Sequence, residues 1–203
     1  MKKLILISTF ILFCPLAGFA QEVPKNEISG GFSELRETQQ DKPRYAPGFY
    51  VSYARNFNSW LAAEAEYSGH FETQTRQFIA AGPGGGLAIY EDRTKIADHL
   101  LLFGPKFTYR KIERVNLFAH ALGGLRTSTT DETFPVGVFP NVTNTTVHRS
   151  GTTFAVAAGG GVDINITKRF AIRAAQADYV RSRQPLLSDR NDLRLSTGLV
   201  FRF

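Results

Sequence analysis

Three side chains that are common in hydrolytic active sites recur at every second position of one short segment: Glu66, Ser68 and His70. A serine, a histidine and a carboxylate in line can serve as a nucleophile, a base and an orienting group. If the segment is a β-strand, the three share one face, but neighbours on that face lie about 7 Å apart. A serine and a histidine at that distance do not touch, so the spacing favours a structural role over catalysis.

Other motifs for cofactor, metal or nucleic-acid binding are weak. The run Gly82–Gly86 has the composition of a phosphate-binding loop, but no lysine followed by serine or threonine comes after it, so we interpret it as a loop tip. Cys14 is the single cysteine, which excludes an intramolecular disulfide and a cysteine-ligated metal within one chain. The basic residues are scattered and lack a nucleic-acid motif. The sequence therefore predicts no cofactor, no metal and no nucleic-acid partner.

Residues 1–20 have the features of a cleaved secretory signal peptide. Two lysines precede an apolar run from Leu4 to Leu12, and Gly18 and Ala20 are the small residues before the expected cut. Without those two lysines the 24 basic groups become 22, against 18 acidic groups, so the mature domain of residues 21–203 has a net charge of +4. No later stretch is long and apolar enough to cross a bilayer as a helix, which leaves a soluble exported protein or a membrane barrel.

Most of the mature domain alternates between apolar side chains and polar or small ones, with the two-residue period of a β-strand. In the last segment, for example, leucines and phenylalanines fill one face, while Arg194 and Arg202 lie on the other. Eight segments are expected to be strands: Asn26–Glu37, Phe49–Ala54, Leu61–Phe71, Leu100–Arg110, Val115–Arg126, Phe154–Ile166, Phe170–Val180 and Leu193–Phe203. The alternation slips in the seventh, where Arg173 and Asp178 can share a face only if a β-bulge separates them.

The links between these segments alternate strictly between short and long. The short ones are Asn56–Ser59, Lys111–Arg114 and Thr167–Arg169, and the long ones are Thr38–Pro47, Glu72–Asp98, Thr127–Ser150 and Arg181–Asn191. In a meander this places every long link at one end and every turn at the other, as in outer-membrane barrels. Strands of about ten residues also match a tilted crossing of a bilayer. The predicted fold is all-β, an eight-stranded antiparallel up-and-down transmembrane β-barrel.

With these features, residues 21–203 resemble the small eight-stranded outer-membrane β-barrels of Gram-negative bacteria, the family that includes the OmpA transmembrane domain, OmpX and the opacity-type proteins. The final segment, Leu195–Phe203, is similar to the assembly signal of that family, and Leu199, Phe201 and Phe203 form its outward face. The resemblance implies that the chain lies in the cell outer membrane of a Gram-negative bacterium, contacts outer-membrane lipid and is inserted by the barrel insertion machinery. We expect a monomer.

The interior of such a barrel is just wide enough for its own side chains, and buried charges there must pair or find water. We therefore expect a structural network of ion pairs among the inward-facing charges Glu64, Glu66, Lys106, Arg110, Asp163, Arg194 and Arg202. The alternative is a narrow porin-like channel for small solutes. Opening one would break buried pairs at about 3–5 kcal/mol each, which disfavours it.

A barrel enzyme that modifies lipid A is the second alternative. His120 lies in a segment where the deacylase-like pattern needs a serine at the position of Leu122, and that serine is absent. We therefore expect no enzymatic activity. The function that the sequence favours is a structural or surface-recognition, adhesion-like role, in which the long extracellular loops Glu72–Asp98 and Thr127–Ser150 contact an extracellular ligand.

Overall fold

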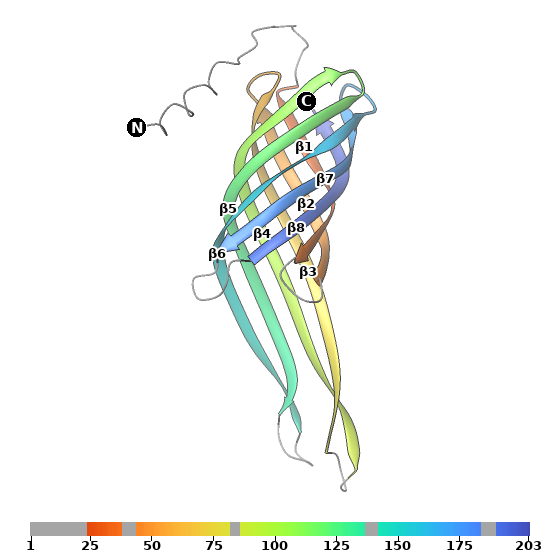
Figure 1. The fold of residues 1–203 in the computed structure, drawn as a ribbon, viewed down its shortest axis with the longest axis vertical. Helices are drawn as coiled ribbons and strands as arrows, with labels where there is room; N and C mark the ends of the chain where they lie inside the picture. The colour runs from red at the N-terminus through yellow and green to blue at the C-terminus, as the bar shows by residue number, and fades with distance from the viewer. Residues whose placement is uncertain (1–23, 38–43, 82–85, 137–141, 184–189) are drawn as a thin grey trace, which may run out of the picture.

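The computed structural model describes residues 24–37, 44–81, 86–136, 142–183 and 190–203, which form one closed barrel (Figure 1). Its eight strands are β1 (Asn26–Glu37), β2 (Arg44–Asn56), β3 (Leu61–Ala81), β4 (Leu87–Ile112), β5 (Val115–Val136), β6 (Thr143–Asn165), β7 (Phe170–Arg183) and β8 (Arg190–Arg202). Each strand pairs antiparallel with the next, and β8 pairs with β1 to close the ring. The predicted fold class is confirmed. The expected signal peptide, residues 1–20, lies outside the described residues.

The three short turns and both ends of the described chain lie at the same end of the barrel (Figure 1). Backbone hydrogen bonds close the barrel there: Asn26 N donates to Phe203 O over 2.8 Å, and Phe203 N donates to Asn26 O over 3.0 Å. We refer to this as the turn end and to the opposite end as the mouth. Among the described residues, no helix is long and apolar enough to span a membrane.

At the mouth, the prediction of two long loops is wrong. β3 and β4 continue as a paired hairpin from Phe71↔Ala97 to Ala81↔Leu87, and β5 and β6 continue to Val136↔Thr143. β4 and β5 also pair as far as Arg93↔Thr133, so the four strands form one sheet that projects beyond the barrel (Figure 1). These segments show no apolar alternation because neither face of the projecting sheet enters a membrane core, yet their threonines favour extended backbone.

The predicted bulge in β7 is confirmed. The pairing of β7 with β8 shifts register between Arg173 and Gln176, and both of these side chains are buried while the two alanines between them are exposed. The extra residue in the bulge shifts the alternation of inward and outward side chains by one position. As a result, Arg173 and Asp178 both face the interior.

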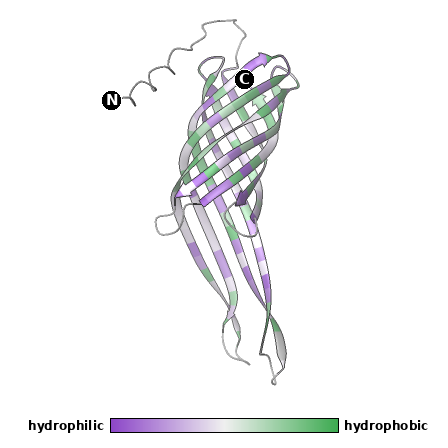
Figure 2. Ribbon diagram, in the orientation of Figure 1, coloured by the Kyte–Doolittle hydropathy of each residue, from purple (hydrophilic) through white to green (hydrophobic). Residues whose placement is uncertain are grey.

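The barrel is apolar outside and polar inside, the reverse of a soluble protein. Leu199 is 67% exposed and Phe103 is 64% exposed, whereas Glu64 and Arg194 are completely buried. Figure 2 shows apolar residues on the strands of the barrel and mainly polar or neutral residues on the projecting sheet. An exposed apolar band around a closed barrel with a charged interior is the arrangement of a transmembrane β-barrel.

Two glycines allow a close approach of β1 and β8. Gly31 and Gly198 are direct partners, flanked by Tyr50 on β2 and Arg173 on β7. The guanidinium of Arg173 lies 5.8 Å from the centre of the Tyr50 ring, so the two large side chains meet while the strands between them carry none. A Cβ added to Gly31 would lie 2.1 Å from the carbonyl oxygen of Thr197.

We therefore expect Gly31→Ala to lower the free energy of unfolding by about 1–3 kcal/mol, since the backbone must shift to admit the methyl group. Urea unfolding of the refolded barrel in lipid vesicles measures the change. Gly151→Ala is the matched control, because no atom lies within 4 Å of its added Cβ. Equal stabilities of the two variants would contradict the close approach.

Candidate functional site

The interior of the barrel is filled by a network of ion pairs in three levels, and the level nearest the turns is built around Glu27. Its carboxylate accepts from Lys106 Nζ over 2.5 Å and from Arg202 Nε over 2.9 Å. Arg202 also lies 3.5 Å from Asp163, which binds Arg173 over 2.9 Å. These five residues come from β1, β4, β6, β7 and β8, so the level links strands on all sides of the barrel.

The middle level is centred on His120 of β5. Its Nδ1 lies 2.8 Å from Glu64 Oε2, and its Nε2 lies 2.8 Å from Asp178 Oδ1. Both contacts are hydrogen bonds to carboxylates only when the ring carries two protons. Arg194 completes the level by binding Asp178 over 2.7 Å and by pairing with Glu66.

At the mouth, Arg126 binds Asp98 over 2.8 Å and Asp192 over 2.5 Å. Arg190 lies within 3.4 Å of Asp98 and 3.2 Å of Asp192, which closes a four-membered ring of alternating charges. This level separates the two deeper ones from the projecting sheet.

The structure places six of the seven interior charges inferred from the sequence in this network: Glu64, Glu66, Lys106, Asp163, Arg194 and Arg202. Arg110 differs. It is half-buried at the turn end and donates to Ser59 O over 2.7 Å and to Asn56 Oδ1 over 3.2 Å, without a carboxylate partner among the described residues.

Sequence reasoning missed eight members of the network: Glu27, Asp98, His120, Arg126, Arg173, Asp178, Arg190 and Asp192. Alternation on β1 carries a signal for Glu27, which shares a face with small and polar residues, whereas on β5 His120 and Arg126 share their face with Phe118 and Leu122, so the signal there is weaker. Asp98 was assigned to a loop, and Arg173 and Asp178 lie on opposite sides of the bulge.

The serine, histidine and carboxylate of β3 do not form a catalytic triad. His70 Nε2 lies 3.0 Å from Ser33 Oγ on β1, and Ser68 Oγ accepts from Arg194 Nη1 over 3.2 Å. All these side chains are fully buried beneath the ring of charges at the mouth. Within the described ranges, no group of three or more potential protein ligands is arranged to hold a metal ion.

The proposed assembly residues lie on the outer surface at the end of β8. Phe201 packs against Phe170 with a distance of 4.9 Å between ring centres and against Phe203 with a distance of 5.6 Å. Leu199 and Phe203 are 67% and 52% exposed to the membrane side. The three side chains therefore form one apolar, largely aromatic strip beside the seam with β1.

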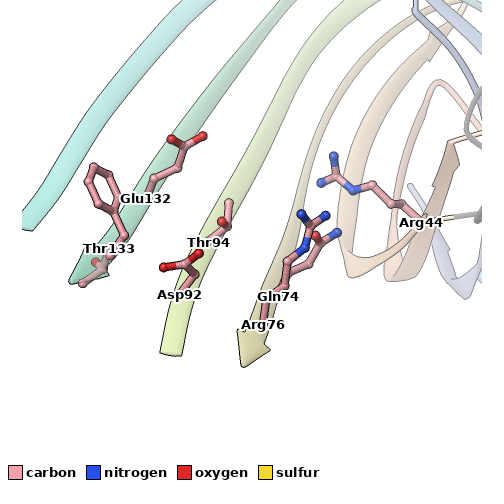
Figure 3. Close-up of a pocket in the computed structure, with 8 residues that line it drawn as sticks. Arg44, Gln74, Arg76, Asp92, Thr94, Glu132 and Thr133 are labelled. Carbon is pink, nitrogen blue, oxygen red and sulfur yellow. The ribbon is translucent and has the colours of Figure 1, made fainter. Parts of the chain in front are cut away.

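Outside the barrel, a pocket of about 420 Å³ lies on the face of the projecting sheet that continues the barrel interior. Its lining consists of Arg44, Gln74, Arg76, Asp92, Thr94, Glu132, Thr133 and Phe134. Figure 3 shows Arg44 extending toward Gln74 and Arg76. Arg44 is held by Glu72 over 2.7 Å, whereas Arg76 is exposed. With two cations, two carboxylates and several neutral donors, the pocket suits a polar ligand.

Comparisons with solved structures agree with this architecture. Ail, the attachment invasion locus protein of Yersinia pestis, in complex with the heparin analogue sucrose octasulfate, is 18% identical with a TM-score of 0.55, over 89% of this chain and 99% of Ail. A second structure of Ail is 20% identical with a TM-score of 0.53 and the same coverage. Neisserial surface protein A is 11% identical with a TM-score of 0.50, over 88% of this chain and 97% of its own. No protein-family model matches the sequence, and no curated protein matches it.

At these identities the likeness establishes the fold. The chain is a transmembrane β-barrel of the small outer-membrane type, which confirms the resemblance inferred from its sequence. Together with the exposed apolar band, this fold places the protein in the outer membrane of a Gram-negative bacterium.

Proposed function

We propose that this barrel is a surface-recognition protein whose projecting sheet contacts an extracellular ligand while the barrel anchors it in the outer membrane. The observation that carries the proposal is the unequal length of the strands. β2 and β3 pair only up to Gly48↔His70, and β6 and β7 pair only from Phe154↔Arg183, yet β3 to β6 continue together beyond these points (Figure 1).

The two outer edges of the projecting sheet support a binding role. On β3 from Glu72 to Ala81, and on β6 from Thr143 to Thr153, no described residue pairs with the outward edge. Unpaired strand edges are sites at which another chain or ligand can form hydrogen bonds. The polar pocket lies between these edges, and binding sites are commonly carried by extensions of a rigid scaffold.

The filled interior supports recognition rather than transport. Three levels of buried ion pairs occupy the barrel, and each would have to break for a solute to pass. An enzymatic role has no assembled nucleophile and base exposed to lipid among the described residues. Ail, the attachment invasion locus protein, has the same fold and was crystallised in complex with a heparin analogue, which makes immobilised heparin a suitable first probe.

Trimming both hairpins should abolish ligand binding without affecting insertion. Replacing residues 75–93 and residues 130–149 by two-residue Asn-Gly turns keeps the pairs Gln74↔Thr94 and Thr129↔Ser150 in register. We expect cells carrying the trimmed protein to lose adhesion to host-cell layers and to a heparin surface, while the unboiled protein still migrates faster than the boiled protein on a denaturing gel.

Trimming one hairpin at a time provides the control, because each single variant keeps one free edge. If adhesion persists after both hairpins are removed, the projecting sheet is not the binding surface. The recognition proposal is then wrong, and envelope support remains as the function. Solute conductance through the purified barrel, or a changed lipid A mass in cells that express it, would replace recognition by transport or by catalysis.

A further inference from the structure

The turn end of the barrel carries a concentration of exposed positive charge. Six basic side chains there are exposed, just before β1, at the ends of β2 and β4 and in two of the turns: Lys25, Arg55, Lys111, Arg114, Lys168 and Arg169. We call these six residues the basic rim. Glu113 is the single exposed acidic residue among the described residues at this end, and no ion pair joins any of the six to another described residue.

The projecting sheet at the opposite end shows no such excess. Outside the buried network it carries four basic residues, Arg76, Arg93, Lys95 and Arg149, and five acidic ones, Glu72, Glu91, Asp92, Asp131 and Glu132. Some of these pair locally, as Arg93 does with Glu91 over 3.3 Å. Among the described residues, the exposed positive charge is therefore concentrated at the turn end.

Exposed aromatic side chains lie at the same end of the barrel as the basic rim. Phe57 and Trp60 occupy the turn between β2 and β3 and are 65% and 50% exposed. Trp60 stacks on Phe107 with a distance of 6.0 Å between ring centres, and Phe170 follows Arg169 directly. Aromatic rings favour the boundary between hydrocarbon and headgroups, and long basic side chains reach from that boundary toward the phosphates.

We propose that the basic rim binds the headgroups of anionic phospholipids in the leaflet that surrounds the turn end. In outer-membrane barrels the short turns face the periplasm, so this is the inner, phospholipid leaflet. The six cations lie next to β1, in β2 and β4, and in the turns after β4 and β6, so they are distributed around the barrel rather than gathered on one face. A distribution around the circumference fits a ring of lipids better than one docked macromolecule.

The position of Trp60 provides a direct test, because it is the single tryptophan of the chain. The full mature barrel is reconstituted in phosphatidylcholine vesicles that contain, in both leaflets, rising fractions of brominated phosphatidylglycerol or brominated phosphatidylcholine. Each cation near an anionic surface contributes about a fivefold preference. We therefore expect brominated phosphatidylglycerol to be favoured around Trp60 by about fivefold or more, and 1 M salt to reduce that preference toward unity.

The variant Arg55→Gln/Lys111→Gln/Arg114→Gln should lose the preference, whereas Arg93→Gln/Lys95→Gln on the projecting sheet should keep it. The experiment with salt needs no substitution, so a poorly folding variant does not prevent the test. Equal quenching by the two brominated lipids, or a preference that persists in 1 M salt, would overturn the proposal. So would sedimentation of the barrel with purified peptidoglycan that depends on the basic rim while lipid selectivity is absent.

Discussion

Asp178→Ala is expected to lower the free energy of unfolding by about 3–5 kcal/mol, because it removes one of the two carboxylate partners of each of two buried cations. Asp178 is completely buried and accepts from His120, from Arg194 over 2.7 Å and from Gln176 over 2.7 Å. Without it, His120 keeps only Glu64 and Arg194 keeps only Glu66 as a charged partner. Urea unfolding in lipid vesicles, followed by the fluorescence of Trp60, measures the loss.

Two further variants serve as controls. One removes the charge of Asp178 but keeps the volume of its side chain, and the other removes an ion pair that is exposed rather than buried. Asp178→Asn keeps the shape and one acceptor, so we expect a smaller loss than for alanine. Asp131→Ala removes an exposed acidic group that pairs with His148, and a change within about 0.5 kcal/mol is expected there. If Asp178→Ala were no more destabilising than Asp131→Ala, the middle level would not be a fixed network.

Deletion of Phe203 is expected to reduce the membrane-inserted form several-fold while export continues. The deletion removes the aromatic ring that stacks on Phe201 and the two backbone hydrogen bonds with Asn26 that close the barrel, each worth about 0.5–1.5 kcal/mol. The faster-migrating form on an unboiled gel, compared with the total exported protein, gives the inserted fraction.

Single substitutions of Phe203 distinguish the contribution of its ring to insertion from the contribution of its backbone hydrogen bonds. Phe203→Tyr keeps both and should insert normally, whereas Phe203→Ala keeps the backbone bonds with Asn26 and loses the ring. If insertion of Phe203→Ala equals that of the unchanged protein, the ring is not part of the assembly signal. Insertion of the deletion variant at full yield would show that the alternating strand is sufficient.

The two-residue alternation of the chain is sufficient to predict the fold class and the two faces of each barrel strand. A half-buried strand repeats every two residues, so the position of Leu199 or of Arg194 along the chain fixes whether its side chain faces lipid or interior. Short polar turns between such strands permit only antiparallel neighbours. The same local rule exposed the slip in β7, because Arg173 and Asp178 could share a face only across an extra residue.

The alternation of apolar and polar residues does not predict the projecting sheet. Alternation records the difference between two environments, and beyond Phe71 both faces of β3 are outside the barrel wall. Residues such as Thr73 and Gln74 then carry no apolar period, although the backbone remains extended and paired with β4. Strands that pair without burying a face show no apolar alternation, so the sequence of an extended hairpin predicts a loop.

Which interior charges pair with one another does not follow from the alternation and depends on the closed barrel. Glu27 and Lys106 are separated by 79 residues, and His120 is separated from Glu64 by 56 and from Asp178 by 58. Such contacts cross the lumen between strands that are not neighbours in the sheet, so they depend on the closure of the barrel and on the register of every pair around it. A two-residue period gives the direction of a side chain but not its partner. The partner depends on how far distant strands are shifted relative to each other along the barrel axis. The hydrogen bonds around the closed barrel fix these shifts.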